Sequence, residues 1–245
     1  MTTIEGNLQG LQKRLAAACV AAGRDVTSVT LLAVSKTFGP EAVDEAVAAG
    51  QRAFGENYIQ EGAEKVLALR ALHPDAALEW HCIGPVQSNK TRLVATHFDW
   101  VHSVDRLKVA QRLAEQRPPG LAPLQVCLQV NVDGGANKSG VTPDELPELA
   151  REVAALGGLR LRGLMCIPEP SEDTAVQRGA FRRVRELLER LNAQGLTLDT
   201  LSMGMSDDLE SAVAEGATLV RVGRAIFGHR PRKDTLTSSP VPGSV

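Results

Sequence analysis

The stretch TLLAVSKT, residues 30–37, is an apolar and β-branched run that ends on a lysine and is followed by Gly39-Pro40. A run that is apolar on both faces is typical of a buried strand in a parallel sheet. Lys36 has the parity of Leu32 and Val34, so its side chain should project to the same side of the strand. An ammonium at the edge of an apolar core is poorly hydrated, which favours a nucleophilic amine able to form a Schiff base. The alternative is a lysine that extends from the strand end into solvent.

Beyond this stretch, the chain alternates between strand and helix. The predicted strands cover residues 30–36, 53–55, 78–83, 100–103, 124–130, 159–167, 198–203 and 219–222, and a helical pattern follows each of them. Eight strand–helix units in 245 residues are the number that a (β/α)8 barrel of the TIM type requires. An additional N-terminal helix is predicted over residues 4–20, where leucines recur at helical spacing.

The predicted fold is therefore α/β, with one barrel domain over residues 1–229. An open doubly wound sheet is the alternative, but no Gly-x-Gly-x-x-Gly motif follows the first strand. Residues 230–245 are rich in proline, serine, threonine and glycine, and we expect them to form a disordered tail.

Composition narrows the function classes. The net charge is −2, from 27 basic and 29 acidic residues, which gives no electrostatic reason to expect nucleic acid or a membrane surface as a partner. The N-terminus lacks the basic and apolar regions of a signal peptide, so a cytoplasmic location is expected. The four cysteines and five histidines show no ligand spacing, and neither a metal site nor a disulfide framework is predicted.

The loops after the seventh and eighth strands offer a candidate anion site. In barrels the working face lies at the C-terminal ends of the strands, and phosphate commonly binds at these two loops. Each loop here carries a glycine, Gly204 or Gly223, before a predicted helix start. The alternative for Ser206 is a helix cap. Lys36, on the first strand, would be their neighbour around a closed barrel.

Two further polar residues lie at predicted strand ends. Arg221 is inside the apolar strand 219–222, and a buried arginine needs a partner, so it should face the barrel mouth or form an ion pair with a barrel carboxylate. Asn57 follows the second strand as either a helix cap or a ligand contact. A lysine beside a phosphate site suits a phosphorylated aldehyde such as pyridoxal 5′-phosphate (PLP).

Several long motifs resemble those of the pyridoxal-phosphate homeostasis protein family. They are AVSKT at 33–37, FGENY at 54–58, WHCIGPVQSNK at 80–90, GLM at 163–165, LSMGMSDD at 201–208 and RVGRAIFG at 221–228, and the resemblance extends from about residue 4 to 229. It implies that Lys36 forms the Schiff base with PLP, that Ser206, Gly223 and Arg224 surround the phosphate, that Arg221 faces the ring nitrogen, and that Asn57 lies near the cofactor. Position 224 is often a small hydroxyl residue in this family, so the arginine departs from the pattern.

By this resemblance the chain is expected to be a PLP carrier without substantial catalysis. It would buffer the cofactor or deliver it to PLP-dependent apoenzymes, and we expect it to be a monomer. The family's barrel is similar to that of alanine racemase, so an amino-acid racemase is the main alternative. Two-base proton transfer needs a second acid or base, and Tyr58 is the single tyrosine. A Schiff-base aldolase acting on a sugar phosphate is a further alternative.

Overall fold

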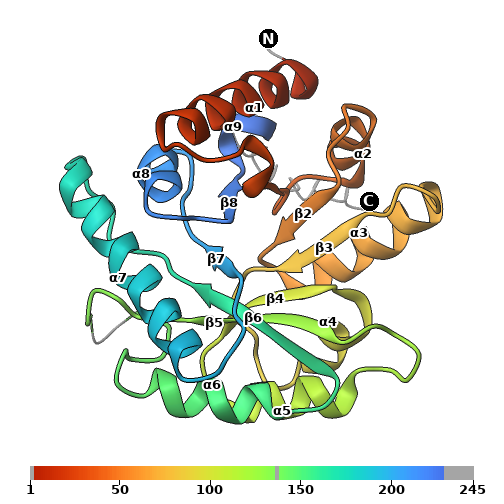
Figure 1. The fold of residues 1–245 in the computed structure, drawn as a ribbon. Coiled ribbons are helices and arrows are strands. Elements are labelled where there is room, and N and C mark those ends of the chain that lie inside the picture. The colour runs from red at the N-terminus through yellow and green to blue at the C-terminus, as the bar shows by residue number, and fades with distance from the viewer. Residues whose placement is uncertain (1–2, 136–137, 229–245) are drawn as a thin grey trace, which may run out of the picture.

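A computed structural model describes residues 3–135 and 138–228, and in it eight parallel strands close into one barrel (Figure 1). Each strand pairs with the next along the chain, and β8 closes on β1 with Leu32 opposite Arg221. The strands are β1 (Thr30–Val34), β2 (Ala53–Glu56), β3 (Glu79–Cys82), β4 (Trp100–Val104), β5 (Leu124–Gln129), β6 (Leu159–Met165), β7 (Thr200–Ser202) and β8 (Leu219–Val222). The predicted barrel is confirmed, and the open sheet is wrong.

Helices surround the barrel in chain order (Figure 1). They are α1 (Ile4–Ala21), α2 (Pro40–Ala48), α3 (Ile59–Leu72), α4 (Thr91–His97), α5 (Leu107–Gln116), α6 (Leu146–Ala154), α7 (Thr174–Ala193), α8 (Leu209–Ala214) and α9 (Arg224–Phe227). Every predicted helix is present, with ends that differ by a few residues. A short 3-10 helix, Val26–Ser28, was not predicted.

Local sequence explains where the main helices begin. Thr3 caps α1 by accepting a hydrogen bond from the backbone N–H of Gly6, and Asp173 caps α7 in the same way through Ala175. Pro40 occupies the first turn of α2, where a missing N–H costs nothing. The additional helix α1 packs against α8 and α9 (Figure 1), and Asn7 Nδ2 donates to the Ile226 carbonyl at 2.8 Å.

The main apolar core lies between the barrel and the helices, as in other barrels of this architecture. Small apolar clusters also occur among the strand residues: Leu32, Ala53 and Leu219 form one, and Trp100, Cys127 and Met165 another. All four cysteines are buried and free. None of the helices in residues 3–135 and 138–228 combines the length and the apolar character that a membrane span requires. The tail predicted for 230–245 lies outside the described residues, so the predicted domain boundary stays a prediction.

Candidate functional site

The C-terminal mouth of the barrel holds a cavity of about 640 Å³. All six residues singled out in the sequence line it: Lys36, Asn57, Ser206, Arg221, Gly223 and Arg224. They come from the ends of β1, β2, β7 and β8, which are far apart in the sequence. Closure of the barrel brings them together, since β8 pairs directly with β1. The volume lies within the roughly 300–1,000 Å³ that is usual for small-molecule sites.

Lys36 lies just beyond the end of β1 and is half-buried. It lines the cavity together with Val34, as the shared parity predicted, instead of extending to the outer surface. The next residue, Thr37, has a φ of 70°, in the left-handed region that a β-branched residue rarely adopts. Such a conformation persists only where the surroundings hold it.

A buried charge cluster holds the backbone on both sides of Lys36. It consists of the buried pair Glu56 and Lys65, with Glu61, whose side chain is 38% exposed, at its edge. The Glu56 and Lys65 side chains are only 0% and 4% exposed, and Lys65 Nζ lies 2.6 Å from Glu56 Oε1 and 2.9 Å from Glu61 Oε1. Lys65 also donates to the Ser35 carbonyl at 2.8 Å, and Ser35 Oγ donates to Glu56 at 2.6 Å. Glu61 accepts from the Thr37 N–H at 2.8 Å. This buried charge cluster therefore fixes the position from which Lys36 projects.

This buried charge cluster was not predicted from the sequence. One signal was available, since Glu61 and Lys65 are four apart on α3, the spacing of a helical ion pair. That spacing gave no indication that Lys65 is buried or that Glu56, on β2, is its second partner. Burial raises the pKa of the Glu56 carboxyl, while the nearby Lys65 ammonium partly offsets that effect.

Arg221 is 5% exposed and lines the floor of the cavity. Its Nη1 donates to Ser202 Oγ at 2.7 Å and its Nη2 donates to the Cys166 carbonyl at 2.9 Å. Among the residues that the structure describes, no carboxylate lies within ion-pair distance of the Arg221 guanidinium. The predicted alternative, an ion pair between Arg221 and a barrel carboxylate, is therefore wrong. Burial lowers the pKa of the guanidinium from its ordinary value.

Asn57 is not a helix cap, because Tyr58 occupies the N-cap position of α3. The loop after β3 packs on its backbone: a Cβ added to Gly84 would overlap the Asn57 carbonyl oxygen. Asn57 Oδ1 is buried and has no hydrogen-bond partner among the residues that the structure describes. A buried amide oxygen without a partner is costly, which favours the ligand contact over the cap.

Ser206 is not a cap either, because α8 begins at Leu209 and Asp208 holds the N-cap position. Asp208 Oδ1 instead accepts from the backbone N–H of Met205 at 2.6 Å, which shapes the loop that presents Ser206 to the cavity. The loop after β8 lies against β1, since a Cβ at Gly223 would come within 2.9 Å of the Val34 carbonyl oxygen. A glycine is therefore needed to bring this loop close to Lys36.

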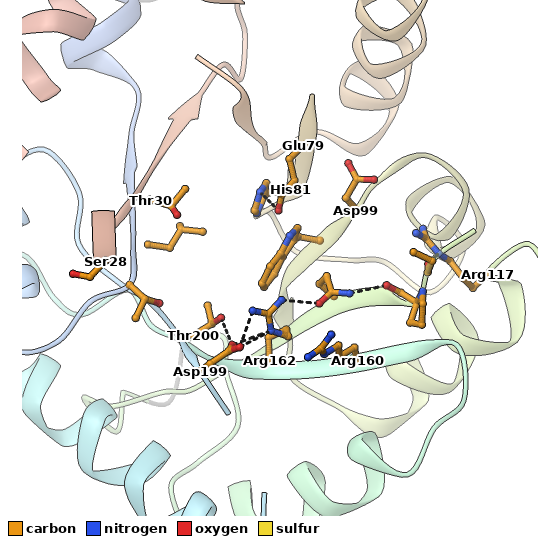
Figure 2. A pocket seen from close by; sticks show the side chains of 16 residues that line it. Ser28, Thr30, Glu79, His81, Asp99, Arg117, Arg160, Arg162, Asp199 and Thr200 are labelled. Carbon is orange, nitrogen blue, oxygen red and sulfur yellow. Dashed lines mark hydrogen bonds and ion pairs between the residues drawn. The ribbon is translucent and has the colours of Figure 1, made fainter. Parts of the chain in front are cut away.

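Figure 2 shows the opposite mouth of the barrel, which holds a second cavity of about 720 Å³ lined by residues at the starts of the strands. Arg162 donates there to Asp199 at 2.7 and 2.8 Å and to Gln125 at 2.9 Å, and it lies 4.9 Å from the centroid of the Trp100 ring. Arg117 donates to two backbone carbonyls at 2.7 and 2.8 Å. These cations already have partners, and barrel sites form at the other mouth, so the candidate site is the C-terminal cavity.

His102, in the barrel interior, leads to a prediction for the pH dependence of stability. Burial, helped by the nearby His81 and Arg221, lowers the pKa of His102 well below its ordinary value of 6.5. Below pH 6.5 the unfolded chain binds a proton that the folded protein excludes, so the free energy of unfolding should fall as the pH falls. The expected slope is at most about 1.4 kcal/mol per pH unit.

Urea denaturation between about pH 5 and 8 measures this slope, and His102→Asn, which cannot titrate, is the matched variant. Its free energy of unfolding should depend less on pH below 6.5 than that of the wild type. Equal slopes for the two proteins would show that His102 does not contribute.

Comparison with protein families gives a match over residues 7–231 to the model of the alanine racemase N-terminal domain. Among curated proteins, the chain is 61% identical to the pyridoxal phosphate homeostasis protein of Pseudomonas aeruginosa, over 94% of this chain and 97% of that protein. The protein of the same name from Escherichia coli K12 is 50% identical, over 94% and 98%.

Among solved structures, PipY of Synechococcus elongatus with PLP bound superimposes with a TM-score of 0.79 and 38% identity, covering 92% of this chain and all of PipY. The similarity therefore spans the whole barrel and both loops of the candidate site. The chain belongs to the family of the alanine racemase N-terminal domain and, within it, to the pyridoxal phosphate homeostasis proteins.

Proposed function

We propose that this chain binds PLP in the C-terminal cavity, holds it as a Schiff base on Lys36, and takes part in intracellular PLP homeostasis. The observation that carries the proposal is that Lys36, Arg221 and the loops of Ser206 and Gly223 line one cavity of about 640 Å³. The relatives named for PLP homeostasis, and the PLP-bound structure of PipY, support the same assignment.

The cavity suits the chemistry of PLP. A phosphate dianion needs donors, and the loops after β7 and β8 present the Ser206 hydroxyl and backbone N–H groups, with the exposed Arg224 side chain at the rim. The aromatic ring needs apolar walls, which Val34, Ile83 and Ile167 provide. The unpartnered Asn57 Oδ1 can accept a hydrogen bond from a ligand. Bound PLP supplies an electron-poor ring that stabilises negative charge on carbon.

Arg221 favours a carrier over a racemase. Its guanidinium only donates and keeps its proton in proteins, so a ring nitrogen that faces it is held unprotonated. Asp207, which is exposed, is the only carboxylic acid among the described residues that line the cavity, and Tyr58 is exposed and does not line it. A two-base proton transfer therefore has no second positioned group. The proposal extends to a cytoplasmic monomer that exchanges PLP with apoenzymes.

An absorption spectrum of the purified protein mixed with PLP tests the proposed function. We expect a Schiff-base band that borohydride removes, together with negligible racemisation of alanine and other amino acids. Racemisation at ordinary enzymatic rates would replace the carrier with a racemase. Absence of the band, with turnover of a sugar phosphate, would instead support the aldolase.

Substitution of Ser206 tests the phosphate contact. Charge-assisted hydrogen bonds contribute about 1.5–3 kcal/mol each, so Ser206→Ala should weaken PLP binding by about tenfold or more. Dephosphorylated pyridoxal lacks the phosphate and should bind the variant nearly as well as it binds the wild type. Fluorescence titrations with the two ligands measure the difference, and an equal loss for both would place Ser206 away from the phosphate.

A further inference from the structure

A line of polar side chains crosses the barrel interior from Arg221 to the opposite mouth. Arg221 Nη1 is 2.7 Å from Ser202 Oγ, which is 2.7 Å from His102 Nδ1. His102 Nε2 is 2.8 Å from His81 Nδ1. All four residues are buried, with exposed fractions of 5% or less. The line joins the cavity of Lys36 to the second cavity, which His81 lines.

Glu79 lies at the outer end of this line. His81 Nε2 is 3.3 Å from Glu79 Oε1, which is close enough for an electrostatic contact but, unlike the other links, is not aligned as a hydrogen bond (Figure 2). The contact with His81 lowers the pKa of Glu79, which keeps the carboxylate charged. A charged acceptor therefore stands at one end, and a permanent donor, Arg221, at the other.

Donor and acceptor chemistry gives the line a direction. A guanidinium only donates, so Ser202 Oγ must accept from Arg221. The one hydroxyl hydrogen of Ser202 is then donated to His102 Nδ1, which must be unprotonated. His102 consequently carries its hydrogen on Nε2 and donates it to His81 Nδ1. A neutral His81 is then left with its hydrogen on Nε2, the nitrogen that lies 3.3 Å from the Glu79 carboxylate.

The reverse direction is less favourable at both ends. If His102 donated from Nδ1 to Ser202, that oxygen would accept twice, and the buried Ser202 hydroxyl hydrogen would have no other hydrogen-bond partner among the residues that the structure describes. A neutral His81 would then present a nitrogen lone pair to the Glu79 carboxylate. Burial also keeps His102 neutral, which agrees with a single hydrogen on its ring. The Ser202 hydroxyl orientation and the two tautomers are thus coupled.

We propose that Ser202, His102 and His81 form one directed hydrogen-bond chain, with the Glu79 carboxylate at its outer end, that keeps His102 Nδ1 an acceptor for Ser202 and so fixes the Arg221 guanidinium in the cofactor cavity. His102 and His81 are positioning residues, because they act on the cavity only through Ser202 and Arg221. The chain ends at Arg221, which cannot accept a proton, so it orients the guanidinium and does not conduct protons into the cavity. The proposal rests on the proposed PLP function for its effect on the cofactor.

The tautomers give a test that needs no cofactor. Long-range proton–nitrogen NMR spectra of the ligand-free protein distinguish hydrogen on Nδ1 from hydrogen on Nε2. We expect His81 and His102 both to carry hydrogen on Nε2 at neutral pH. Hydrogen on Nδ1 of His102 would overturn the directed chain whether or not the protein binds PLP.

Variants of the chain test its effect on the cavity. An asparagine places an amide group near the position of a histidine Nδ1, whereas a glutamine reaches the position of Nε2. His102→Asn should therefore keep a hydrogen-bond acceptor for Ser202, and His102→Gln should lose it. We expect His102→Gln and Ser202→Ala to weaken PLP binding about tenfold and to shift the absorption maximum of bound PLP, while His102→Asn stays close to the wild type.

Three outcomes distinguish the hydrogen-bond chain from a merely structural role of these residues and from failure of the proposed PLP function. A shift in the absorption maximum of bound PLP in His102→Gln and Ser202→Ala, but not in His102→Asn, supports the hydrogen-bond chain. Identical spectra and affinities for His102→Asn, His102→Gln and the wild type would overturn it, because a merely structural role changes folding stability and leaves the bound spectrum unmoved. If the wild type binds no PLP, the proposed function fails, and the NMR tautomers still decide whether the chain exists.

Discussion

Lys36→Ala is expected to fold like the wild type and to form no borohydride-stable adduct with PLP. Lys36 is half-buried at the end of β1, beyond the last residue that pairs in the strand, so its removal costs little packing. A Schiff base needs a primary amine, and alanine has none. Loss of the adduct should therefore be complete, whereas the phosphate contacts should still allow weaker, non-covalent binding. Reduction with borohydride followed by peptide mapping measures the adduct.

Other lysines near the C-terminal mouth provide the controls. Lys138 lies on the loop after β5 and pairs with Asp133 and Glu169 at 2.7 and 3.0 Å, and Lys90 precedes α4. Lys138→Ala and Lys90→Ala should retain the adduct on Lys36. Label on Lys90 or Lys138 with Lys36 unmodified would contradict the assignment.

The barrel could be predicted because the sequence pattern that determines each strand and helix lies within that element and its flanking residues. Each strand–helix unit carries its own apolar run and its own breaks, and eight units allow few other closures. The same rules place strand ends at one mouth, so Lys36, Ser206 and Arg221 could be assigned to one cavity, whereas only the family resemblance placed Asn57 there. Strand parity was sufficient to orient Lys36 inward, and the cost of burying an arginine without a partner indicated that Arg221 faces the mouth.

Partners of buried polar groups could not be predicted, because they depend on the register of neighbouring strands and on the direction of each side chain. An ion pair with a barrel carboxylate was one of two alternatives for Arg221, but a hydroxyl on β7 and a carbonyl after β6 accept its hydrogens instead. His81 on β3 has His102 on β4 as its partner. The sequence spacing between these residues carries no signal of the contact, since it depends on the register of β3 against β4.

The partners in the buried charge cluster at Glu56 could not be predicted for the same reason. Substitution in this cluster is expected to have a large effect on the stability of the protein. Lys65→Met is expected to lower the free energy of unfolding by about 3–5 kcal/mol, because it leaves a buried carboxylate without its cation. Glu56 would keep a hydrogen bond from Ser35, but its other oxygen already has no partner in the described part of the chain. Urea denaturation of the ligand-free protein measures the loss.

The double variant Glu56→Leu/Lys65→Met is the control, since it removes both charges together. Replacement of a buried ion pair by apolar side chains is often nearly neutral, so the double variant should recover much of the stability lost by Lys65→Met. It should not recover PLP binding fully, because Lys65 also holds the Ser35 carbonyl, next to Lys36, at 2.8 Å. A loss below about 1 kcal/mol for Lys65→Met, the range of exposed ion pairs, would show that the cluster is solvated and does not fix the backbone at Lys36.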